Sequence, residues 1–299
     1  MERSAAEPKS ARSENDLVIE AWNTVLFDKF ALFEHLLTSG LAPHSNEALS
    51  RHPPPAGARV LDVGCGFGDT TRKIAGAVGA GGRAVGVDCA DNFILRAAQD
   101  AERLGVSNAT FFVADVQSVD LRGPYDRAFS RFGTMFFALP GAALRNIRRA
   151  LAPGGELTMI VWRRREDNPW LYEAELRVRE IVPVVSHDET SQVHCGPGPF
   201  SMAGPDLVSD LLRSAGFERI TFERFDTDIC IGRDLNEAVD FAMALGPAGE
   251  IIRLAGDEGV KRKGEIERGL RESLSRFARA EGVWGPSSTW FVTARNPAA

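Results

Sequence analysis

The stretch Val60-Leu61-Asp62-Val63-Gly64-Cys65-Gly66-Phe67-Gly68-Asp69-Thr70-Thr71 decides the fold of this chain. Its apolar start, Val60, Leu61 and Val63, suits a β-strand that is covered on both faces, as in a parallel sheet. The glycine-rich turn that follows leads into a helix predicted over residues 70–78, with Asp69 as its N-cap. The stretch therefore predicts a strand–turn–helix unit with a tight, glycine-built corner.

The spacing of the glycines indicates what this corner binds. Three glycines in the pattern G-x-G-x-G let the backbone turn tightly and approach a ligand where a Cβ would collide. A dinucleotide-binding turn has the spacing G-x-G-x-x-G and holds a pyrophosphate. Here Asp62 precedes the first glycine by two residues, and a carboxylate there would repel a pyrophosphate but suit an ammonium group. An ordinary tight turn without a ligand remains the alternative.

Length and composition limit the class of protein. The chain has 299 residues, enough for one large α/β domain or two small ones, and its 44% hydrophobic and 25% charged residues are ordinary for a globular protein. The formal charge of −6 (35 basic against 41 acidic residues) implies no broad basic surface and argues against a non-specific nucleic-acid binder.

Several signals place the chain in a compartment. No stretch approaches the roughly 20 apolar residues of a membrane span. Residues 1–15 are polar and lack an apolar core, so we expect a disordered tail rather than a secretion signal. The four cysteines are scattered without a C-x-x-C pair, which indicates a reduced, cytoplasmic protein without a structural zinc site.

Strand and helix patterns alternate through the first half of the chain. After the strand at 60–63 we expect strands at 83–87, 110–113, 125–129 and 157–162, with helices at 70–78, 93–104 and 141–151. This alternation predicts a parallel sheet with right-handed crossovers. Asp88 ends the second strand, 20 residues after Gly68, where an acid accepts hydrogen bonds from ribose hydroxyls in nucleotide-binding folds. It could instead cap the next helix, although Asp91 is better placed for that.

Taken together, the glycine turn, Asp88, the strand-ending Asp115 and the run Leu151-Ala152-Pro153-Gly154-Gly155-Glu156-Leu157 resemble class I S-adenosylmethionine (SAM) dependent methyltransferases. The resemblance covers about residues 60–162 and is nearest to bacterial small-molecule enzymes, including the ubiquinone/menaquinone C-methyltransferase group. It implies an α/β, Rossmann-like sheet of seven strands with helices on both faces and an antiparallel closing strand.

The resemblance also implies a cofactor site for SAM. Asp62 and the turn at Ser130 and Arg131 would face the methionine half, Asp88 the ribose, and Asp115 with the Val116 backbone the adenine. Cys89 would pack on the adenine ring. Asp115 could alternatively cap a turn, as Asp often does. The full set of expected cofactor-binding residues is Asp62, Gly64, Cys65, Gly66, Gly68, Asp88, Cys89, Asp115, Val116, Ser130 and Arg131.

The remaining segments lie outside the predicted core, which we place at residues 57–165. In the N-terminal segment 16–56, apolar side chains at helical spacing over residues 16–39 predict one long or two short helices, which form either a lid over the site or a packing element. Residues 166–216 are expected to be an inserted helix and a loop that cap the site. Residues 217–299 complete the sheet, with strands expected at 219–225 and 290–294. The helices inserted at 235–281, among them one expected over 260–280, extend the cap or form the surface of a homodimer.

Large apolar residues, both in these segments and within residues 57–165, are candidates for contact with the acceptor substrate, or else pack in the protein interior, as such residues usually do. They are Trp22, Phe27, Phe30, Met135, Phe136, Trp162, Trp170 and Phe200. His194 is the candidate catalytic base or substrate contact, with a surface-loop position as its alternative. The cluster of His187, Asp188, Glu189, His194 and Cys195 fits no standard ligand spacing, so we expect no metal.

These observations predict a methyltransferase acting on an O, N or C nucleophile of a small aromatic or hydrophobic metabolite and releasing S-adenosylhomocysteine. A general base is optional, because phenols and amines can lose their proton beforehand. An NAD(P)-dependent oxidoreductase is opposed by the glycine spacing and Asp62. A non-catalytic SAM-binding protein is a second alternative, which no sequence feature favours. We expect no nucleic-acid partner and no membrane span.

Overall fold

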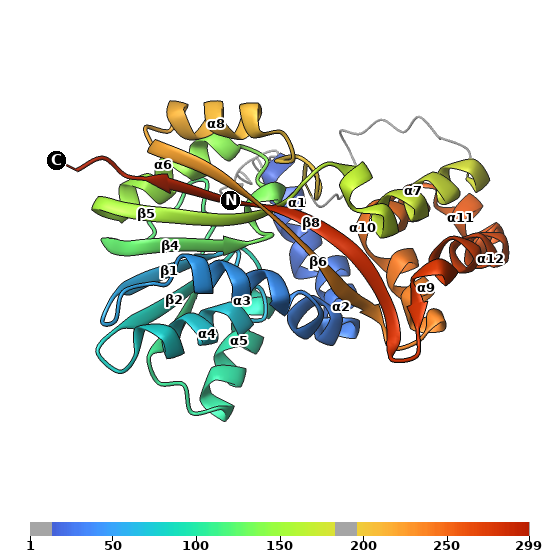
Figure 1. The fold of residues 1–299 in the computed structure, drawn as a ribbon, viewed down its shortest axis with the longest axis horizontal. Coiled ribbons are helices and arrows are strands. Elements are labelled where there is room, and N and C mark those ends of the chain that lie inside the picture. Colours follow the sequence, from blue (N-terminus) through green and yellow to red (C-terminus); the bar gives the residue numbers. More distant parts are fainter. Residues whose placement is uncertain (1–13, 183–195, 299) are drawn as a thin grey trace, which may run out of the picture.

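One mixed β-sheet organises the molecule, whose computed structural model describes residues 14–182 and 196–298 (Figure 1). The strands follow the order β3-β2-β1-β4-β5-β8-β6, and the short β7 pairs with one end of β8. Their bounds are β1 Arg59–Val63, β2 Arg83–Asp88, β3 Ala109–Val113, β4 Tyr125–Arg131, β5 Leu151–Trp162, β6 Glu218–Gly232, β7 Ala278–Arg279 and β8 Gly282–Arg295.

The direction of the strands follows the predicted class. Strands β1 to β5 pair in parallel. Strand β8 inserts between β5 and β6 and is antiparallel to both. The Rossmann-like sheet with an antiparallel closing strand is therefore confirmed.

Both faces of the sheet are covered by helices. Neighbouring residues of a strand point to opposite faces, so a strand of consecutive apolar residues needs packing partners on both sides. In β1, Val60 packs in one apolar cluster with helices α3 and α4, and the adjacent Leu61 packs in another with α6 and α8. The helices are α1 Glu14–Asn23, α2 Val25–Leu32, α3 Ala42–Arg51, α4 Asp69–Val78, α5 Asp91–Arg103, α6 Pro140–Ala150, α7 Pro169–Ile181, α8 Pro205–Ser214, α9 Leu235–Ala244, α10 Gly246–Leu254, α11 Asp257–Lys261 and α12 Lys263–Leu274.

Strands β6 and β8 are longer than the sequence pattern indicates. They have 15 and 14 residues, whereas we expected strands only at 219–225 and 290–294. Pairing with β5 ends at Thr289, so the first half of β8 is bonded to β6 and to the short β7. Pro286 is tolerated there because a proline, which has no N–H, can occupy a strand that lacks a partner on one side.

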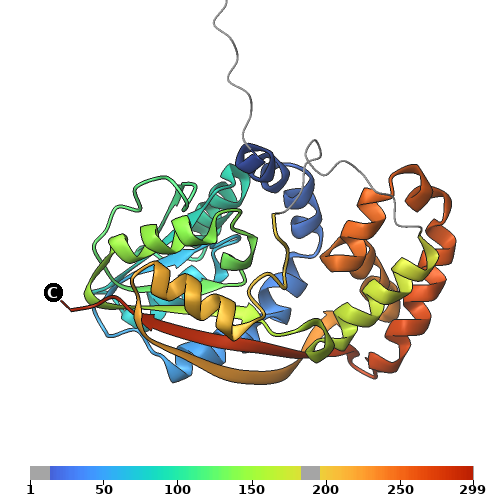
Figure 2. The same ribbon diagram turned by 90° about the horizontal axis from the view of Figure 1, so that it is seen from above.

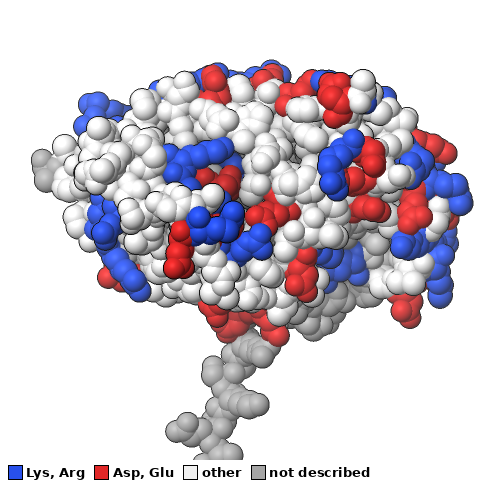
Figure 3. Space-filling model, turned by 90° about the horizontal axis from the view of Figure 1, so that it is seen from below, with Lys and Arg blue, Asp and Glu red and all other residues white. Residues whose placement is uncertain are grey.

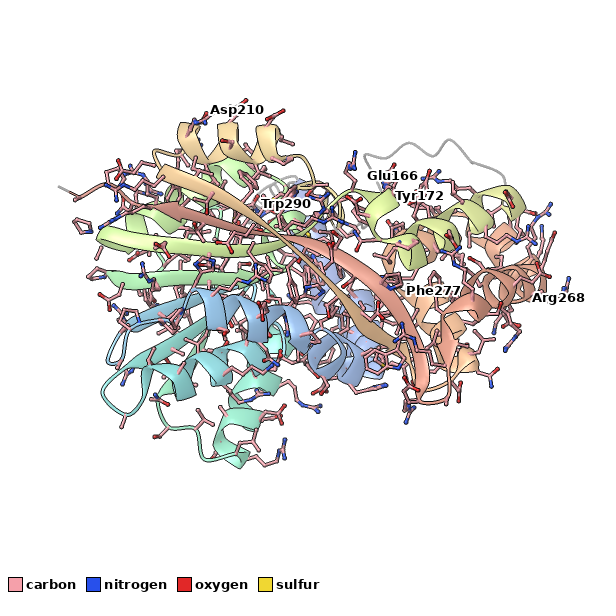
Figure 4. All side chains as sticks on the ribbon, in the orientation of Figure 1. Glu166, Tyr172, Asp210, Arg268, Phe277 and Trp290 are labelled. Atoms are coloured by element: carbon pink, nitrogen blue, oxygen red, sulfur yellow. The ribbon has the colours of Figure 1, made fainter. Side chains whose placement is uncertain are left out.

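The extended strands form an arm that carries a helical cap (Figure 1). Helix α7 packs against α10 and α12, and α9 contacts both of these helices as well as β6. The continuous helix expected over 260–280 is instead divided, because α11 and α12 meet at Arg262 and α12 ends at Leu274. Figure 4 labels Tyr172 on α7 and Arg268 on α12, which mark two sides of this cap.

The N-terminal helices lie between the sheet and the cap (Figure 2). The segment predicted as one or two helices contains α1, α2 and a turn of π-helix at Leu36–Gly40. Helix α3 was not predicted from the sequence. Within the described ranges, no helix combines the length and the apolar character that a membrane span needs.

Helix α3 is fastened to β8 by a buried histidine. The His44 ring lies between Phe132, Trp162 and Phe225, with ring centroids 5.5–5.6 Å apart. Its Nε2 is 2.9 Å from Ser287 Oγ, and its Nδ1 is 3.2 Å from Thr289 Oγ1. Burial, and secondarily the charge of Arg131, lower the His44 pKa to about 3. The folded protein therefore holds this side chain neutral.

This burial predicts acid sensitivity. Below pH 6.5, the pKa of His44 in the unfolded chain, this side chain binds a proton in the unfolded state but not in the folded state. The free energy of unfolding therefore falls as the pH drops toward 3. Between pH 7 and pH 5 the wild type should lose about 1–2 kcal/mol that His44→Gln does not lose, given about 1.4 kcal/mol per pKa unit. Urea unfolding at both pH values measures this. An equal loss in both proteins would contradict it.

Candidate functional site

A cavity of about 740 Å³ lies where the sheet, the N-terminal helices and the cap meet. From β1 the chain adds β2 and then β3 on one side of the sheet, and it then crosses to the other side of β1 to add β4 and β5. The strand order therefore reverses between β1 and β4, which form the switch point of the sheet. Ligands of open α/β sheets bind outside the carboxyl ends of the strands at such a point. The cavity is lined by the turns that follow β1, β2, β3 and β4.

The three glycines of the turn after β1 have different roles, although all have positive φ (+66°, +49° and +70°). A Cβ on Gly64 would lie 2.9 Å from Gly133 Cα, so this glycine lets two backbone turns touch. A Cβ on Gly68 would lie 2.7 Å from the Phe111 ring, and Gly68 is not part of the cavity lining. Gly66 has no protein atom within 4 Å of its Cβ position and lines the cavity. The structure therefore leaves ligand space at Gly66 and packs Gly68 into the core.

Asp88 connects the second strand to the glycine turn. Its Oδ2 accepts a hydrogen bond from the Gly66 N–H (3.0 Å), and its Oδ1 accepts one from the Ala90 N–H (3.1 Å). Burial raises the pKa of this carboxyl, against the lowering effect of these N–H donors. Asp88 and the adjacent Cys89 both line the cavity. Asp88 thus holds the turn in place and lies in the wall of the cavity.

Asp62 does not lie where the sequence suggested. Its side chain is 1% exposed, is absent from the cavity lining, and accepts a hydrogen bond from Thr71 Oγ1 at 2.6 Å. The expected direct contact with an ammonium group is therefore not supported. Asp62 lies behind the turn and joins the end of β1 to the first residues of α4. Its burial raises its pKa to about 7.

The start of α4 also differs from the prediction. Gly68, in the left-handed conformation, occupies the N-cap position, and Asp69 is the first helical residue. The Asp69 carboxylate forms a two-bonded ion pair with Arg131, both bonds measuring 2.9 Å. Asp69 and Arg131 line the cavity. Ser130 does not, because its hydroxyl is buried and donates to the Val63 carbonyl at 2.8 Å.

Asp115 lies in the cavity wall, but helix α1 already contacts it. Asn15 Nδ2 donates to Asp115 Oδ2 at 2.9 Å, and Gln117 Nε2 bridges Asn15 Oδ1 (2.7 Å) and Asp115 Oδ1 (3.1 Å). Val116, Asn15 and Gln117 are also in the lining. The sequence gave no signal for this amide pair, since Asn15 is 100 residues from its carboxylate partner.

Aromatic side chains of the N-terminal helices form one wall. Trp22 contacts Phe30 at 5.2 Å and Phe136 at 5.1 Å between ring centroids, and all three line the cavity. Phe27 is outside the lining and packs instead against Phe67 and Phe93. It is a packing residue of this wall rather than a ligand contact.

The far end of the cavity is formed by the cap. The predicted residues Met135, Trp162, Trp170 and Phe200 all line it. Cap residues that the sequence analysis did not single out join them, namely Leu171, Phe241, Leu245, Ile251 and Leu254. Trp170 stacks on Phe241 at 6.1 Å. This end is therefore predominantly apolar and aromatic.

Four charged residues at this end were also missed: Arg165, Glu175, Arg179 and Glu250. Glu175 lies on α7 among the buried residues Leu171, Ala174 and Val178. A charged residue on the apolar face of an amphipathic helix is a signal that periodicity could have revealed.

His194, the predicted catalytic residue, lies outside the described residues, as do His187, Asp188, Glu189 and Cys195. Within the described part of the chain, no group of three or more His, Cys, Asp or Glu side chains is arranged to hold a metal ion.

The fold and the position of the cavity match what the sequence predicts for a class I SAM-dependent methyltransferase. Residues 60–155 match the protein family described as "Methyltransferase domain". Together with the relatives described next, this match indicates a class I SAM-dependent methyltransferase, a class whose cofactor is SAM.

Relatives of known activity share the core and part of the flanking segments. Nocamycin O-methyltransferase of Saccharothrix syringae is 27% identical over 208 residues, 66% of this chain and 72% of that protein. Ubiquinone/menaquinone biosynthesis C-methyltransferase of Pseudomonas savastanoi pv. phaseolicola is 25% identical over 229 residues, 74% of this chain and 88% of that protein.

Solved structures show the same fold at low identity. Phosphoethanolamine N-methyltransferase 2 of Haemonchus contortus, in complex with SAM, has a TM-score of 0.56 at 16% identity, covering 97% of this chain and 61% of that one. The YcgJ protein of Bacillus subtilis has a TM-score of 0.53 at 16% identity, covering 87% and 99%.

The burial of Asp62 predicts a pH effect opposite to that of His44. Folded Asp62 keeps a proton up to about pH 7, while the unfolded side chain releases it near 3.8, so stability falls as the pH rises between these values. From pH 5 to pH 8 the wild type should lose about 1–3 kcal/mol relative to Asp62→Asn, which has no proton to release. Urea unfolding measures the difference.

Asp210→Asn, on the exposed face of α8 (Figure 4), is the matched control and should track the wild type. A constant difference between wild type and Asp62→Asn across this range would show that Asp62 is ionised in the folded protein.

Proposed function

We propose that the protein transfers a methyl group from SAM to an O, N or C nucleophile of a small, hydrophobic or aromatic metabolite. One observation carries the proposal: a single cavity joins the glycine turn to an apolar end enclosed by the cap. Its volume of about 740 Å³ lies in the upper part of the usual range of roughly 300–1,000 Å³ for ligand sites. Two molecules side by side are what a group transfer requires.

The residues at the switch point fit SAM. Gly66 leaves open space, Asp88 offers carboxylate oxygens for hydroxyl donors, and Asp115 and Val116 lie in the wall after β3. Arg131, held by Asp69, places a positive charge near the turn after β4, where it suits the carboxylate of an amino acid. We assign the methionine half of SAM to this side and the adenine half to the Asp115 side.

When bound, SAM supplies an electrophilic methyl group on a sulfonium ion. The chain contributes orientation, because its aromatic walls can hold a flat acceptor in one position beside the cofactor end. It also contributes water exclusion, since helices α1 and α2, the loop at 196–201 and the cap enclose the site.

The apolar lining favours a small molecule as acceptor. The named relatives methylate at oxygen and at carbon, so their names do not choose the acceptor atom. On the face drawn in Figure 3, basic and acidic side chains are interspersed, without the continuous basic surface that nucleic-acid binding would use.

The two alternatives are less well supported. A nicotinamide-dependent reductase would need room for a pyrophosphate at the glycine turn, whose spacing does not match the dinucleotide pattern. A SAM-binding protein without catalysis would not need the apolar end of the cavity. An assay for methylated product with a panel of phenols, quinols and amines distinguishes an enzyme from a non-catalytic SAM-binding protein.

We further propose that α1 and α2 act as a lid, which the hydrogen bond from Asn15 to Asp115 holds closed. The helices also have a packing role, because Val18, Ala21, Phe33 and Leu36 are buried. Deleting all residues before Leu41 would therefore destabilise the fold and would not isolate a lid function. Substitution of Asn15, which removes this hydrogen bond and leaves the buried residues of the helices in place, is the sharper test.

The cofactor site predicts a specific loss of binding in Gly66→Asn. Asn tolerates positive φ, so the turn can form while the new side chain fills the open space. Calorimetry should show SAM binding in the micromolar range for the wild type, an ordinary level for enzymes, and none for the variant. Asp88→Ala should weaken binding by about 1–3 kcal/mol, the usual cost of an unpaired buried polar group.

Gly105→Asn is the matched control, because Gly105 also has positive φ (+69°) and free space but lies outside the cavity lining. It should bind SAM like the wild type. Normal binding by Gly66→Asn would overturn the site assignment.

The lid predicts a change in hydrogen exchange. S-adenosylhomocysteine should increase amide protection in residues 14–40 and 196–204 of the wild type. Asn15→Ala should raise exchange in α1 and the KM for SAM by roughly threefold to tenfold, while changing the unfolding free energy by no more than about 1 kcal/mol. Asp28→Ala, on the exposed side of α2, is the control. Equal protection with and without ligand in all proteins would identify α1 and α2 as packing elements only.

A further inference from the structure

The acceptor end of the cavity contains one buried carboxylate with an unused oxygen. Glu175, on α7, is 1% exposed. Its Oε1 accepts hydrogen bonds from Arg165 Nη1 (2.9 Å) and from Arg179 Nε (3.1 Å) and Nη2 (2.8 Å). Its Oε2 is buried and has no hydrogen-bond partner among the described residues. All three residues line the cavity.

This arrangement is unusual as a purely structural ion pair. Two guanidinium groups donate to one carboxylate oxygen, while the second oxygen is buried and accepts nothing from the described residues. Buried polar atoms are nearly always hydrogen-bonded, so an unpartnered one beside a cavity marks a place where a ligand group completes the network. The guanidinium groups fix the carboxylate and leave Oε2 as its available acceptor.

The surroundings limit what that ligand group can be. Oε2 can only accept a hydrogen bond, so the ligand must donate one. Two guanidinium groups accompany the Glu175 carboxylate, which disfavours a cationic ammonium donor and leaves a neutral hydroxyl. Glu250, the other carboxylate in the lining of this end, is paired with Arg253. The Phe200 ring lies 5.5 Å from the Arg165 guanidinium carbon, and Leu171 and Phe241 also line this end. These walls suit the ring that would carry the hydroxyl.

We propose that Glu175 is a specificity-determining residue that accepts a hydrogen bond, through Oε2, from a hydroxyl group on an aromatic or otherwise planar acceptor. This rests on the proposed function, because it assigns the acceptor to the cap end of the cavity. It narrows the substrate class from hydrophobic small molecules to hydroxylated ones. Arg165 and Arg179 act through Glu175 by holding its carboxylate in place.

The test uses the full chain saturated with S-adenosylhomocysteine and three probes that share one ring system: 2-naphthol, naphthalene and 2-naphthoate. Dissociation constants come from NMR titration. The wild type should bind 2-naphthol at least tenfold more tightly than naphthalene. In Glu175→Gln the amide oxygen can still accept from the arginines, but a donor replaces the free acceptor. The preference of this variant for 2-naphthol over naphthalene should therefore fall below about threefold.

Glu173→Gln is the matched control, since Glu173 lies on the same helix, pairs with Arg276 and is outside the cavity lining. It should keep the wild-type preference. Glu175→Asp provides a second variant that retains the charge but withdraws the carboxylate by one methylene, and it should lose at least threefold in 2-naphthol affinity. Binding of S-adenosylhomocysteine should be unchanged in every variant, which shows that each one is folded.

Three results would overturn the proposal: an unchanged 2-naphthol preference in both Glu175 variants, no detectable binding of 2-naphthol to the wild type, or tighter binding of 2-naphthoate than of 2-naphthol. The last would mean that the arginines recognise an anion. Failure of the proposed function is distinguishable, because it would appear as a wild-type protein that does not bind S-adenosylhomocysteine.

Discussion

The close approach of two turns at the switch point is the constraint on which the site depends. Strand β1 pairs in parallel with both β2 and β4, so the turns that leave β1 and β4 emerge side by side. They can touch only because Gly64 and Gly133 lack side chains, as a Cβ on Gly64 would lie 2.9 Å from Gly133 Cα. Asp88, hydrogen-bonded to the Gly66 N–H, then fixes the turn from the neighbouring strand. The open space at Gly66 follows from this arrangement.

A second level of structure converts this open edge into an enclosed cavity. The arm of β6 and β8 extends past the end of β5 and positions the cap helices beyond the carboxyl ends of the parallel strands. Helices α1 and α2 fill the space between sheet and cap (Figure 2). The cofactor end of the cavity is therefore built by local turns of the core, and the acceptor end by elements that meet only in three dimensions. The same core can then serve different acceptors when the cap differs.

The buried carboxyl groups differ in their hydrogen-bond partners, and this difference separates those that support the site from the one that we propose contacts the acceptor. Asp62 is enclosed behind the turn and bonded to Thr71, and Asp69 is paired with Arg131. Both support the site by holding its backbone and its guanidinium group in place. Glu175, in the cavity lining, is held by Arg165 and Arg179, yet its second oxygen has no hydrogen-bond partner among the described residues. A satisfied charge indicates support, whereas a partly satisfied one indicates a place for a ligand.

The sequence by itself determined the class of sheet, the switch point and the cofactor, because apolar periodicity, glycine spacing and strand-ending acids such as Asp88 and Asp115 are properties of short segments. It placed Asp62 and Gly68 at the ligand, whereas both lie outside the cavity lining, because pattern alone does not say which residues of a turn face a cavity. Only the tertiary structure revealed the hydrogen bond between Asn15 and Asp115, the length of β6 and β8, and the ion pair between Arg165 and Glu175. Each depends on contacts between elements whose relative positions are set by packing, and local sequence carries no record of them.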